Sequence, residues 1–225
     1  MLFGYEWNLD SSWQFALSIV PILLTGMIVT IKATVLGYIL ALVLGLVLYL
    51  LRSAPLKLIS WPAAAFVEFV RDTPLLVQLY FLYFVLPDYG VVMPAFVTGM
   101  LALGLQYSGY TSEVYRAGIQ AVPRGQREAA IALNLSPLVT FRDVILPQAI
   151  PRVVPALGNY VISMLKDTPI LTAVTIVEML TAAKIIGDRT FRYLIPLTMV
   201  GLLFLILTLL LSYGVRQIER RMPNR

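Results

Sequence analysis

Residues 22–51 read ILLTGMIVTIKATVLGYILALVLGLVLYLL, and Lys32 is the only charged side chain among them. A helix needs about 20 apolar residues to cross the hydrocarbon core of a bilayer, so this stretch is long enough to span a membrane. Further along the chain, four more apolar stretches predict spans at residues 58–86, 91–115, 153–180 and 194–215. The pattern predicts an all-α integral membrane protein with five transmembrane helices in a single transmembrane domain, residues 1–225.

The composition of the chain also indicates a bilayer as its solvent. Hydrophobic residues make up 59% of the chain and charged residues 13%, and the mean hydropathy is +0.84. Soluble domains contain about 25% charged residues. Cys and His are both absent, which excludes a disulfide framework, a thiolate metal site, a Cys nucleophile and a His general base. We therefore expect neither an enzyme active site nor a metal site.

The distribution of basic residues predicts the orientation in the membrane. The net charge of +5 is compatible with nucleic-acid binding, but the basic residues lie between the apolar stretches. The positive-inside rule explains that distribution, and we expect no nucleic-acid partner. The first fifteen residues carry Glu6 and Asp10 but no basic residue, so they lack the positive start of a cleaved signal peptide. With the N-terminus outside, eleven basic residues fall in inside segments and three in outside segments. The predicted topology is N-out and C-in.

The longest polar stretch, residues 116–152, is predicted to form an ordered platform on the cytoplasmic side. A turn at residues 122–125 precedes good helix formers at residues 126–133. Asn134 follows at the position where a residue in the left-handed conformation commonly ends a helix. Ser136-Pro137 then begins the next helix as its N-cap and first residue. This succession predicts a docking platform, and an ordinary amphipathic loop is the alternative from the pattern alone.

Several motifs in this stretch resemble those of a known family. Glu128-Ala129-Ala130, Asn134 and Ile145-Leu146-Pro147 are similar to the cytoplasmic EAA loop of ABC importer permeases. The run YTSEVYRAGIQAVPRGQREA, residues 110–129, resembles the branch that imports polar amino acids such as histidine, glutamine, glutamate or arginine. The resemblance extends over nearly the whole chain, residues 25–216.

The resemblance implies the fold of a type I ABC importer permease in a bacterial inner membrane. In that family the short helix of the loop inserts into a groove on a separate ATP-hydrolysing subunit. This chain has no phosphate-binding Gly-x-x-x-x-Gly-Lys-Ser/Thr motif, so we expect it to need no cofactor of its own. The implied partners are an ATPase subunit dimer, a second permease subunit (identical or paralogous) and an extracytoplasmic solute-binding protein. The residues predicted to dock the ATPase are Arg124, Gly125, Gln126, Glu128, Ala129, Ala130 and Asn134.

The chain departs from the family pattern at two positions. Asn134 stands where the family usually has Gly, and Asn is expected to preserve the left-handed turn with slightly more strain. Pro169 stands where the family commonly has Ser. Because Pro lacks a backbone donor, we expect the backbone around Pro169 to differ from the family pattern.

Two charged residues near the middle of the fourth predicted span are the leading candidates for solute contact. Ionisable groups at bilayer depth cost about 2.5–3.5 kcal/mol each on insertion scales, so Lys166 and Asp167 should pair, line water or bind solute. Pro169 is predicted to break the helix and to free carbonyl groups to line a cavity. A zwitterionic solute offers a carboxylate to Lys166 and an ammonium to Asp167; alternatively, each residue neutralises a charge on a neighbouring helix. The predicted solute-binding residues are Lys166, Asp167, Thr168, Gln106 and Tyr160, with Gln106 assigned from the resemblance.

A second charged pair precedes another proline. Arg71-Asp72-Thr73-Pro74 repeats the order basic, Asp, Thr, Pro of residues 166–169, either as corresponding helix breaks in two halves or as a coincidence. Glu68 lies three residues before Arg71, and the two side chains are predicted to pair on one helix face. Gly37 and Gly45 predict a close helix contact in the first span.

The predicted function is that of the permease subunit of an ATP-driven importer for a polar or zwitterionic amino acid or a similar solute. An ion-gradient-driven secondary transporter is the alternative, and it would explain the charges in the fourth span but not the platform. The solute-binding residues suit glutamine, glutamate, histidine, arginine or a compatible solute such as ectoine equally well.

Overall fold

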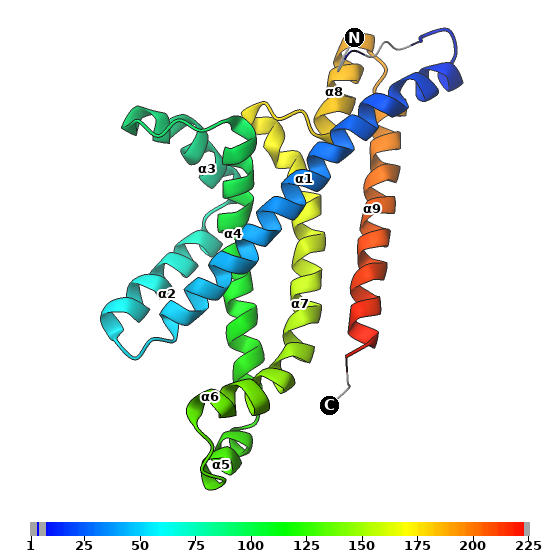
Figure 1. Ribbon diagram of the computed structural model, residues 1–225. Coiled ribbons are helices and arrows are strands. Elements are labelled where there is room, and N and C mark those ends of the chain that lie inside the picture. Colours follow the sequence, from blue (N-terminus) through cyan, green and yellow to red (C-terminus); the bar gives the residue numbers. More distant parts are fainter. Residues whose placement is uncertain (1–3, 5–7, 223–225) are drawn as a thin grey trace. The chain divides into compact units, whose positions relative to one another are not determined.

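The computed structural model describes Gly4 and residues 8–222, and every regular element in this part of the chain is helical (Figure 1). Short π-helical or 3-10 turns join several of the α-helices. The α-helices are α1 (Ser12–Arg52), α2 (Lys57–Asp72), α3 (Leu75–Tyr80), α4 (Ala95–Gln120), α5 (Arg124–Ala132), α6 (Pro137–Val139), α7 (Leu146–Asp167), α8 (Met179–Thr190) and α9 (Leu194–Arg220).

Two compact units make up the chain, and several helices contribute residues to both. The first unit contains Met1–Ile39, Thr73–Gly104 and Ser163–Leu210. The second unit contains Leu40–Asp72, Leu105–Ile162 and Leu211–Arg225.

Two helices of the described residues, α1 and α9, are each long and apolar enough to cross a membrane. Two bent pairs would add two more spans if each pair were counted as one: α2 with Leu75–Tyr89, and Pro137–Val174 with α8. The all-helical membrane architecture is therefore confirmed, whereas the five crossings and the N-out, C-in orientation stay predictions.

The first predicted span, residues 22–51, lies within a longer helix. Helix α1 has 41 residues and begins at Ser12, because the Ser11 hydroxyl accepts a hydrogen bond from the N–H of Gln14 at 3.2 Å and caps the helix there. At 1.5 Å per residue α1 is about 60 Å long, roughly twice the thickness of the hydrocarbon core. It therefore extends beyond that core or crosses it at a tilt.

The second predicted span, residues 58–86, is wrong as a single helix. Helix α2 ends at Asp72 and α3 begins at Leu75, with Pro74 in an extended conformation (ψ 137°) between them. Pro disfavours helical geometry in the residue before it and supplies no donor of its own. The Gln78 amide seals this break by donating to the carbonyl oxygen of Thr73 at 3.2 Å and to its hydroxyl at 2.7 Å.

The fourth predicted span, residues 153–180, is not one continuous helix. Helix α7 starts at Leu146 and ends at Asp167. A 3-10 turn, Thr168–Val174, follows with Pro169 in its first turn, so the predicted break at Pro169 is confirmed. The third and fifth predicted spans, residues 91–115 and 194–215, correspond to α4 and α9, which extend further at their C-terminal ends.

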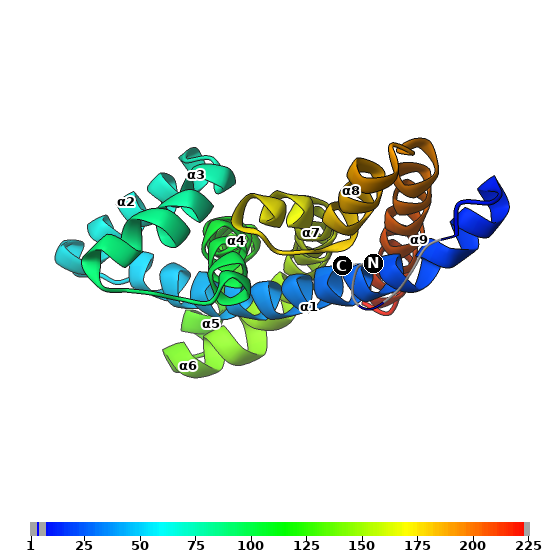
Figure 2. The same cartoon turned by 90° about the horizontal axis from the view of Figure 1, so that it is seen from above.

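The core of the first unit lies where α8 packs against the N-terminal part of α1 and the start of α9 (Figures 1 and 2). Phe15 and Ile19 of α1, Met179 and Ile186 of α8 and Val200 of α9 are all buried there. Burial of apolar surface by this packing stabilises the fold by about 25 cal/mol per Å² where water is the reference solvent. It fixes the position of the turn that precedes α8.

A buried carboxylate organises that turn. Glu178 is fully buried, and its carboxylate accepts hydrogen bonds from the N–H groups of Leu180 (2.9 Å) and Thr181 (2.7 Å) and from the Thr181 hydroxyl. An anion at a helix N-terminus is stabilised by the unpaired N–H groups and the helix dipole. Glu178 thus serves as the N-cap of α8.

In the second unit, α1 crosses α4 at Gly45. The Thr111 hydroxyl donates to the carbonyl oxygen of Ala41 at 2.8 Å, and the Tyr115 hydroxyl donates to that of Leu42 at 3.3 Å. A Cβ atom at Gly45 would lie 1.9 Å from the Thr111 Oγ1. The predicted close contact at Gly45 is therefore confirmed, and only a hydrogen side chain fits.

The crossing gives a test of this packing. We expect Gly45→Ala to destabilise the protein by about 1–3 kcal/mol, because overpacking moves side chains and backbone. Gly214→Ala is the matched control, since no atom lies within 4 Å of a Cβ there and Ala favours helix. The measurement is the melting temperature of detergent-purified protein by fluorescence-detected size exclusion. Equal melting temperatures of the two variants would contradict the contact.

Candidate functional site

An arginine and three tyrosines form a cluster in the second unit. The Arg71 guanidinium carbon lies 5.9 Å from the ring centroid of Tyr110. Tyr110 stacks on Tyr160, with centroids 5.3 Å apart and planes 11° from parallel, and Tyr107 meets both rings edge to face. Buried Gln106 donates its amide N–H to the Tyr110 hydroxyl at 3.2 Å. The five residues form what we call the Arg–Tyr cluster.

The helix geometry explains why these side chains meet. Gln106 and Tyr110 are four residues apart on α4 and so share one face. Gly109, beside them, leaves room for the stem of Arg71, because a Cβ at Gly109 would lie 2.8 Å from the Arg71 Cγ. Tyr160 reaches the same point from α7. A small residue on α4 thus brings an arginine of α2 over an aromatic face.

The charge of Arg71 is only weakly compensated. Its predicted partner Glu68 is present, but the shortest N–O distance is 3.6 Å, and the two side chains are 33% and 53% exposed. Exposed pairs of this kind contribute about 0.2–1 kcal/mol. The Arg71 Nε is buried and has no hydrogen-bond partner in the described part of the chain. Arg71 therefore keeps donor capacity for an additional acceptor, and a guanidinium matches a carboxylate in a bidentate geometry.

The structure brings together two of the five predicted solute-binding residues. Gln106 and Tyr160 both contact Tyr110, whereas Lys166, Asp167 and Thr168 belong to the first unit. Tyr107 and Tyr110 were not among the site residues predicted from the sequence, and Arg71 was predicted to pair with Glu68. The sequence feature that could have identified the two tyrosines is their spacing of three residues, next to Gln106 on one predicted helix.

Residues 166–168 occupy the end of α7. Lys166 and Asp167 are exposed, and Thr168 is fully buried. The Thr168 hydroxyl donates to the carbonyl oxygen of Leu165 at 2.8 Å, which satisfies an unpaired acceptor at the helix end. Within the described residues Lys166 has no ion pair. A solute role for these three residues stays a prediction.

The helix, turn and second helix predicted for residues 122–137 form as expected around α5. Pro123 precedes the helix, and Asn134 has φ 54°, so its predicted left-handed conformation is confirmed. The N–H of Leu135 donates to Ala130 O at 3.0 Å and that of Asn134 to Ile131 O at 2.9 Å, which is a Schellman motif. The predicted Ser136 cap is also present, with its hydroxyl accepting from the N–H of Val139 at 3.4 Å.

The predicted docking residues of α5 lie on different faces of the helix. Ala130 is buried, and Gln126 accepts a hydrogen bond from the amide of Gln148 at 3.2 Å. The remaining predicted residues are exposed: Arg124, Gly125, Glu128, Ala129 and Asn134. A small buried cluster of Val122, Ile145 and Ala149 holds the base of the platform together. In Figure 2 α5 and α6 lie next to each other.

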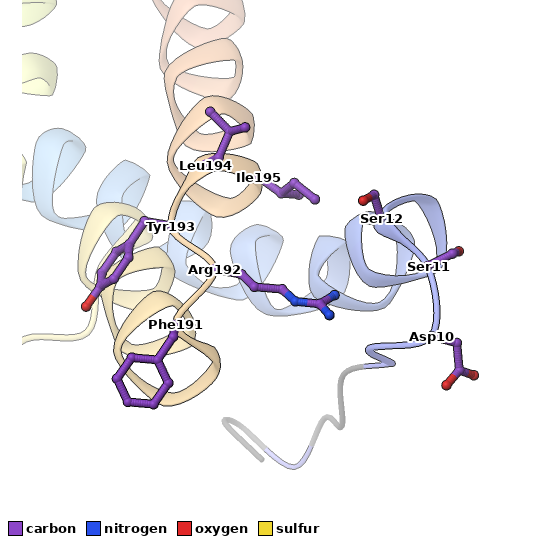
Figure 3. A pocket seen from close by; sticks show the side chains of 8 residues that line it. All are labelled: Asp10, Ser11, Ser12, Phe191, Arg192, Tyr193, Leu194 and Ile195. Carbon is purple, nitrogen blue, oxygen red and sulfur yellow. The ribbon is translucent and has the colours of Figure 1, made fainter.

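A pocket of about 530 Å³ lies in the first unit between residues 10–12 and residues 191–195, which form the α8–α9 loop and the start of α9 (Figure 3). Arg192 extends toward the N-terminal segment, donates to the carbonyl oxygen of Leu9 at 3.1 Å and lies 5.7 Å from the ring centroid of Phe15. Phe191 is 87% exposed at φ 56°, a conformation that costs a non-glycine residue about 1–2 kcal/mol.

A tyrosine in the same loop, Tyr193, has a raised pKa. The Tyr193 hydroxyl donates to the Asp188 carboxylate at 2.7 Å. This hydrogen bond raises the pKa of Tyr193, because the neighbouring carboxylate disfavours a phenolate. Nowhere in the described part of the chain do three Asp or Glu residues lie close enough together to hold a metal ion.

Comparison with known proteins places this geometry in a family. The chain is 58% identical over 226 residues to a probable amino-acid ABC transporter permease of Sinorhizobium fredii, covering 100% of this chain and 98% of that protein. It is 35% identical to an arginine transport system permease of Bacillus subtilis, covering 91% of this chain and 94% of that one. A solved structure described as an amino acid ABC transporter with histidines matches with a TM-score of 0.89 at 36% identity, covering 95% of this chain and 100% of that chain.

The family model described as the inner membrane component of binding-protein-dependent transport systems matches residues 43–224. This range contains the Arg–Tyr cluster and the α5 platform. The chain therefore belongs to the family of inner membrane components of binding-protein-dependent transport systems.

Proposed function

We propose that this chain is the permease subunit of an ATP-driven importer for polar or cationic amino acids, and that the Arg–Tyr cluster binds the solute. The observation that carries the proposal is an incompletely paired arginine held over stacked tyrosines beside a buried amide. The names of its relatives, among them an arginine transport permease and an amino acid transporter with histidines, support an amino acid as solute.

In this proposal each group of the cluster recognises one part of the solute. The α-carboxylate accepts hydrogen bonds from Arg71, and a cationic or aromatic side chain stacks on the faces of Tyr110 and Tyr160. The amide of Gln106 both donates and accepts, so it suits polar side chains. A solute role for Lys166 and Asp167, whose charges match a carboxylate and an ammonium, is proposed separately from the cluster, because both residues belong to the first unit.

The energy source in the proposal is a separate ATPase subunit. The exposed face of α5 with Arg124, Gly125 and Glu128 docks it, and closure of an ATPase pair on ATP moves the platform and shifts the pathway between outward-facing and inward-facing states. A second permease subunit, identical or paralogous, completes the pathway. Membership of a binding-protein-dependent family favours this scheme over an ion-gradient-driven transporter.

The solute-binding protein is assigned to the surface around the α8–α9 loop. Phe191 and Leu194 are 87% and 81% exposed, and exposed aromatic residues beside a pocket are typical of protein contact sites. The strained φ of Phe191 supports a functional reason for the side chain.

The first test addresses the solute site. We expect Arg71→Gln to raise the KM for uptake by about tenfold or more, because a hydrogen bond to a charged group contributes about 1.5–3 kcal/mol. The measurement is uptake of radiolabelled arginine, histidine and glutamine by the complete transporter in proteoliposomes, with Arg216→Gln as the charge-matched control. An unchanged KM for all three amino acids in Arg71→Gln would remove the cluster from the solute pathway.

The second test addresses ATPase docking. We expect Glu128→Arg to abolish co-purification of the ATPase subunit from native membranes, because reversing a charge at an interface costs about 2 kcal/mol or more. Glu219→Arg, at the end of α9, carries the same charge change outside the platform. Recovery of the ATPase with Glu128→Arg at the control level would refute docking on this face.

The third test addresses the solute-binding protein. We expect Phe191→Gly to raise the melting temperature of the permease, because Gly adopts positive φ without strain. We expect it at the same time to lower uptake that depends on the binding protein. Opposite effects on stability and uptake would separate a contact role from a structural one, and full uptake in this variant would count against the assigned surface.

A further inference from the structure

A second pocket lies within the second unit, between the platform and the ends of α1 and α4. The charge distribution predicts that these helix ends are on the cytoplasmic side. The volume of the pocket is about 380 Å³, within the usual range for small-ligand sites. The lining is apolar apart from two residues, Arg127 and Thr140. It includes Tyr49, Ile119, Ile131, Phe141 and Ile145.

The wall of this pocket continues into the exposed apolar face of α1. Tyr49 lies in the last turn of α1, which ends at Arg52. Leu46, one turn earlier on the same face, is 45% exposed, and Leu50 is 57% exposed. Tyrosine at the end of an apolar helix is typical of the membrane–water interface. The pocket therefore lies beside exposed apolar residues of α1, a helix that is apolar enough to cross a membrane.

The pocket carries one unpaired cation. Arg52 and Arg116 are both paired with Glu113, whereas Arg127 has no ion pair among the residues that the structure describes. Ile131, four residues after Arg127 and so on the same face of α5, is 73% exposed at the pocket. An apolar cavity with a free guanidinium is complementary to an amphiphile with a negative headgroup.

We propose that this pocket binds an anionic phospholipid of the inner leaflet, with an acyl chain against Tyr49 and Ile131 and the phosphate on Arg127. Basic pockets between helices on the cytoplasmic side are recognised sites for anionic lipid headgroups. The lipid would fix the distance between α5 and the end of α1.

The geometry of α5 leaves the ATPase-docking face free. At 100° per residue, Arg127 and Ile131 lie within about 40° of each other. Gly125 and Ala129 lie about 160° away from Arg127, Glu128 about 100° away and Arg124 about 60° away. A lipid in the pocket therefore leaves the Gly125 and Ala129 side of α5 free for an ATPase, and lipid composition is expected to influence how firmly the platform is held.

The test uses the absence of cysteine from the chain. A bimane fluorophore on Thr140→Cys, which lines the pocket, is compared with one on Ala132→Cys, which is exposed on α5 and does not line it. Each labelled permease is placed in nanodiscs containing brominated phosphatidylglycerol or brominated phosphatidylcholine. We expect the anionic lipid to quench the Thr140→Cys label preferentially.

The charge dependence identifies the headgroup contact. We expect Arg127→Gln to reduce the preference for the anionic lipid about fivefold, since one basic residue near an anionic surface contributes about that factor. Arg127→Lys should retain most of the preference, and Arg216→Gln, on α9 and outside the lining, should leave it unchanged. Melting temperatures of the variants confirm that each is folded.

Two results would overturn the proposal. Equal quenching by both lipids, or the same preference in Arg127→Gln, would mean that Arg127 does not hold a headgroup. Loss of quenching when the ATPase subunit is added would mean that the pocket receives a segment of that protein instead. Because no readout involves transport, either failure leaves the permease assignment standing.

Discussion

A peptide N–H or C=O without a partner costs several kcal/mol in hydrocarbon, and this constraint governs where the chain can leave helical geometry. In each of the two major breaks the α-helix ends two residues before a proline, Pro74 or Pro169, and neighbouring side chains pair with the exposed backbone groups. Gln78 donates to Thr73 at the first break. At the second, Thr168 donates to the end of α7, and buried Glu178 caps α8. The breaks are thus ordered structures, and the first role of their polar side chains is to form hydrogen bonds with backbone groups.

The low dielectric constant of a membrane protein's interior also strengthens the electrostatic interactions of the Arg–Tyr cluster. A guanidinium in partly buried surroundings interacts more strongly with an aromatic face or an incoming carboxylate than it does in water. Its distant partner Glu68 supplies only partial compensation. The cluster depends on the close approach at Gly109, just as the end of α1 depends on Gly45. Small residues on α4 therefore decide both the packing and the position of the proposed solute contacts.

The α5 platform has a conformation fixed by local hydrogen bonds, and it presents two different faces. Its C-terminal Schellman motif and the Ser136 cap fix the turn between α5 and α6 locally. One side of α5 remains exposed around Glu128, while the side with Arg127 and Ile131 borders a pocket. Under the proposed function, this platform transmits movement from the ATPase subunit to the membrane helices, because its own conformation is set by short-range hydrogen bonds.

The sequence alone determined the membrane class, the platform, the left-handed Asn134, the break at Pro169 and the close contact at Gly45. Each of these depends on composition or on residues a few positions apart. Helix boundaries could be predicted less well from the sequence, because a long apolar run does not show the Ser11 cap or the break before Pro74. Only the tertiary structure decided that Arg71, Tyr110 and Tyr160 meet, since they come from three helices. The physical reason is that packing at a glycine brings distant residues together, and no local pattern records which helices approach each other.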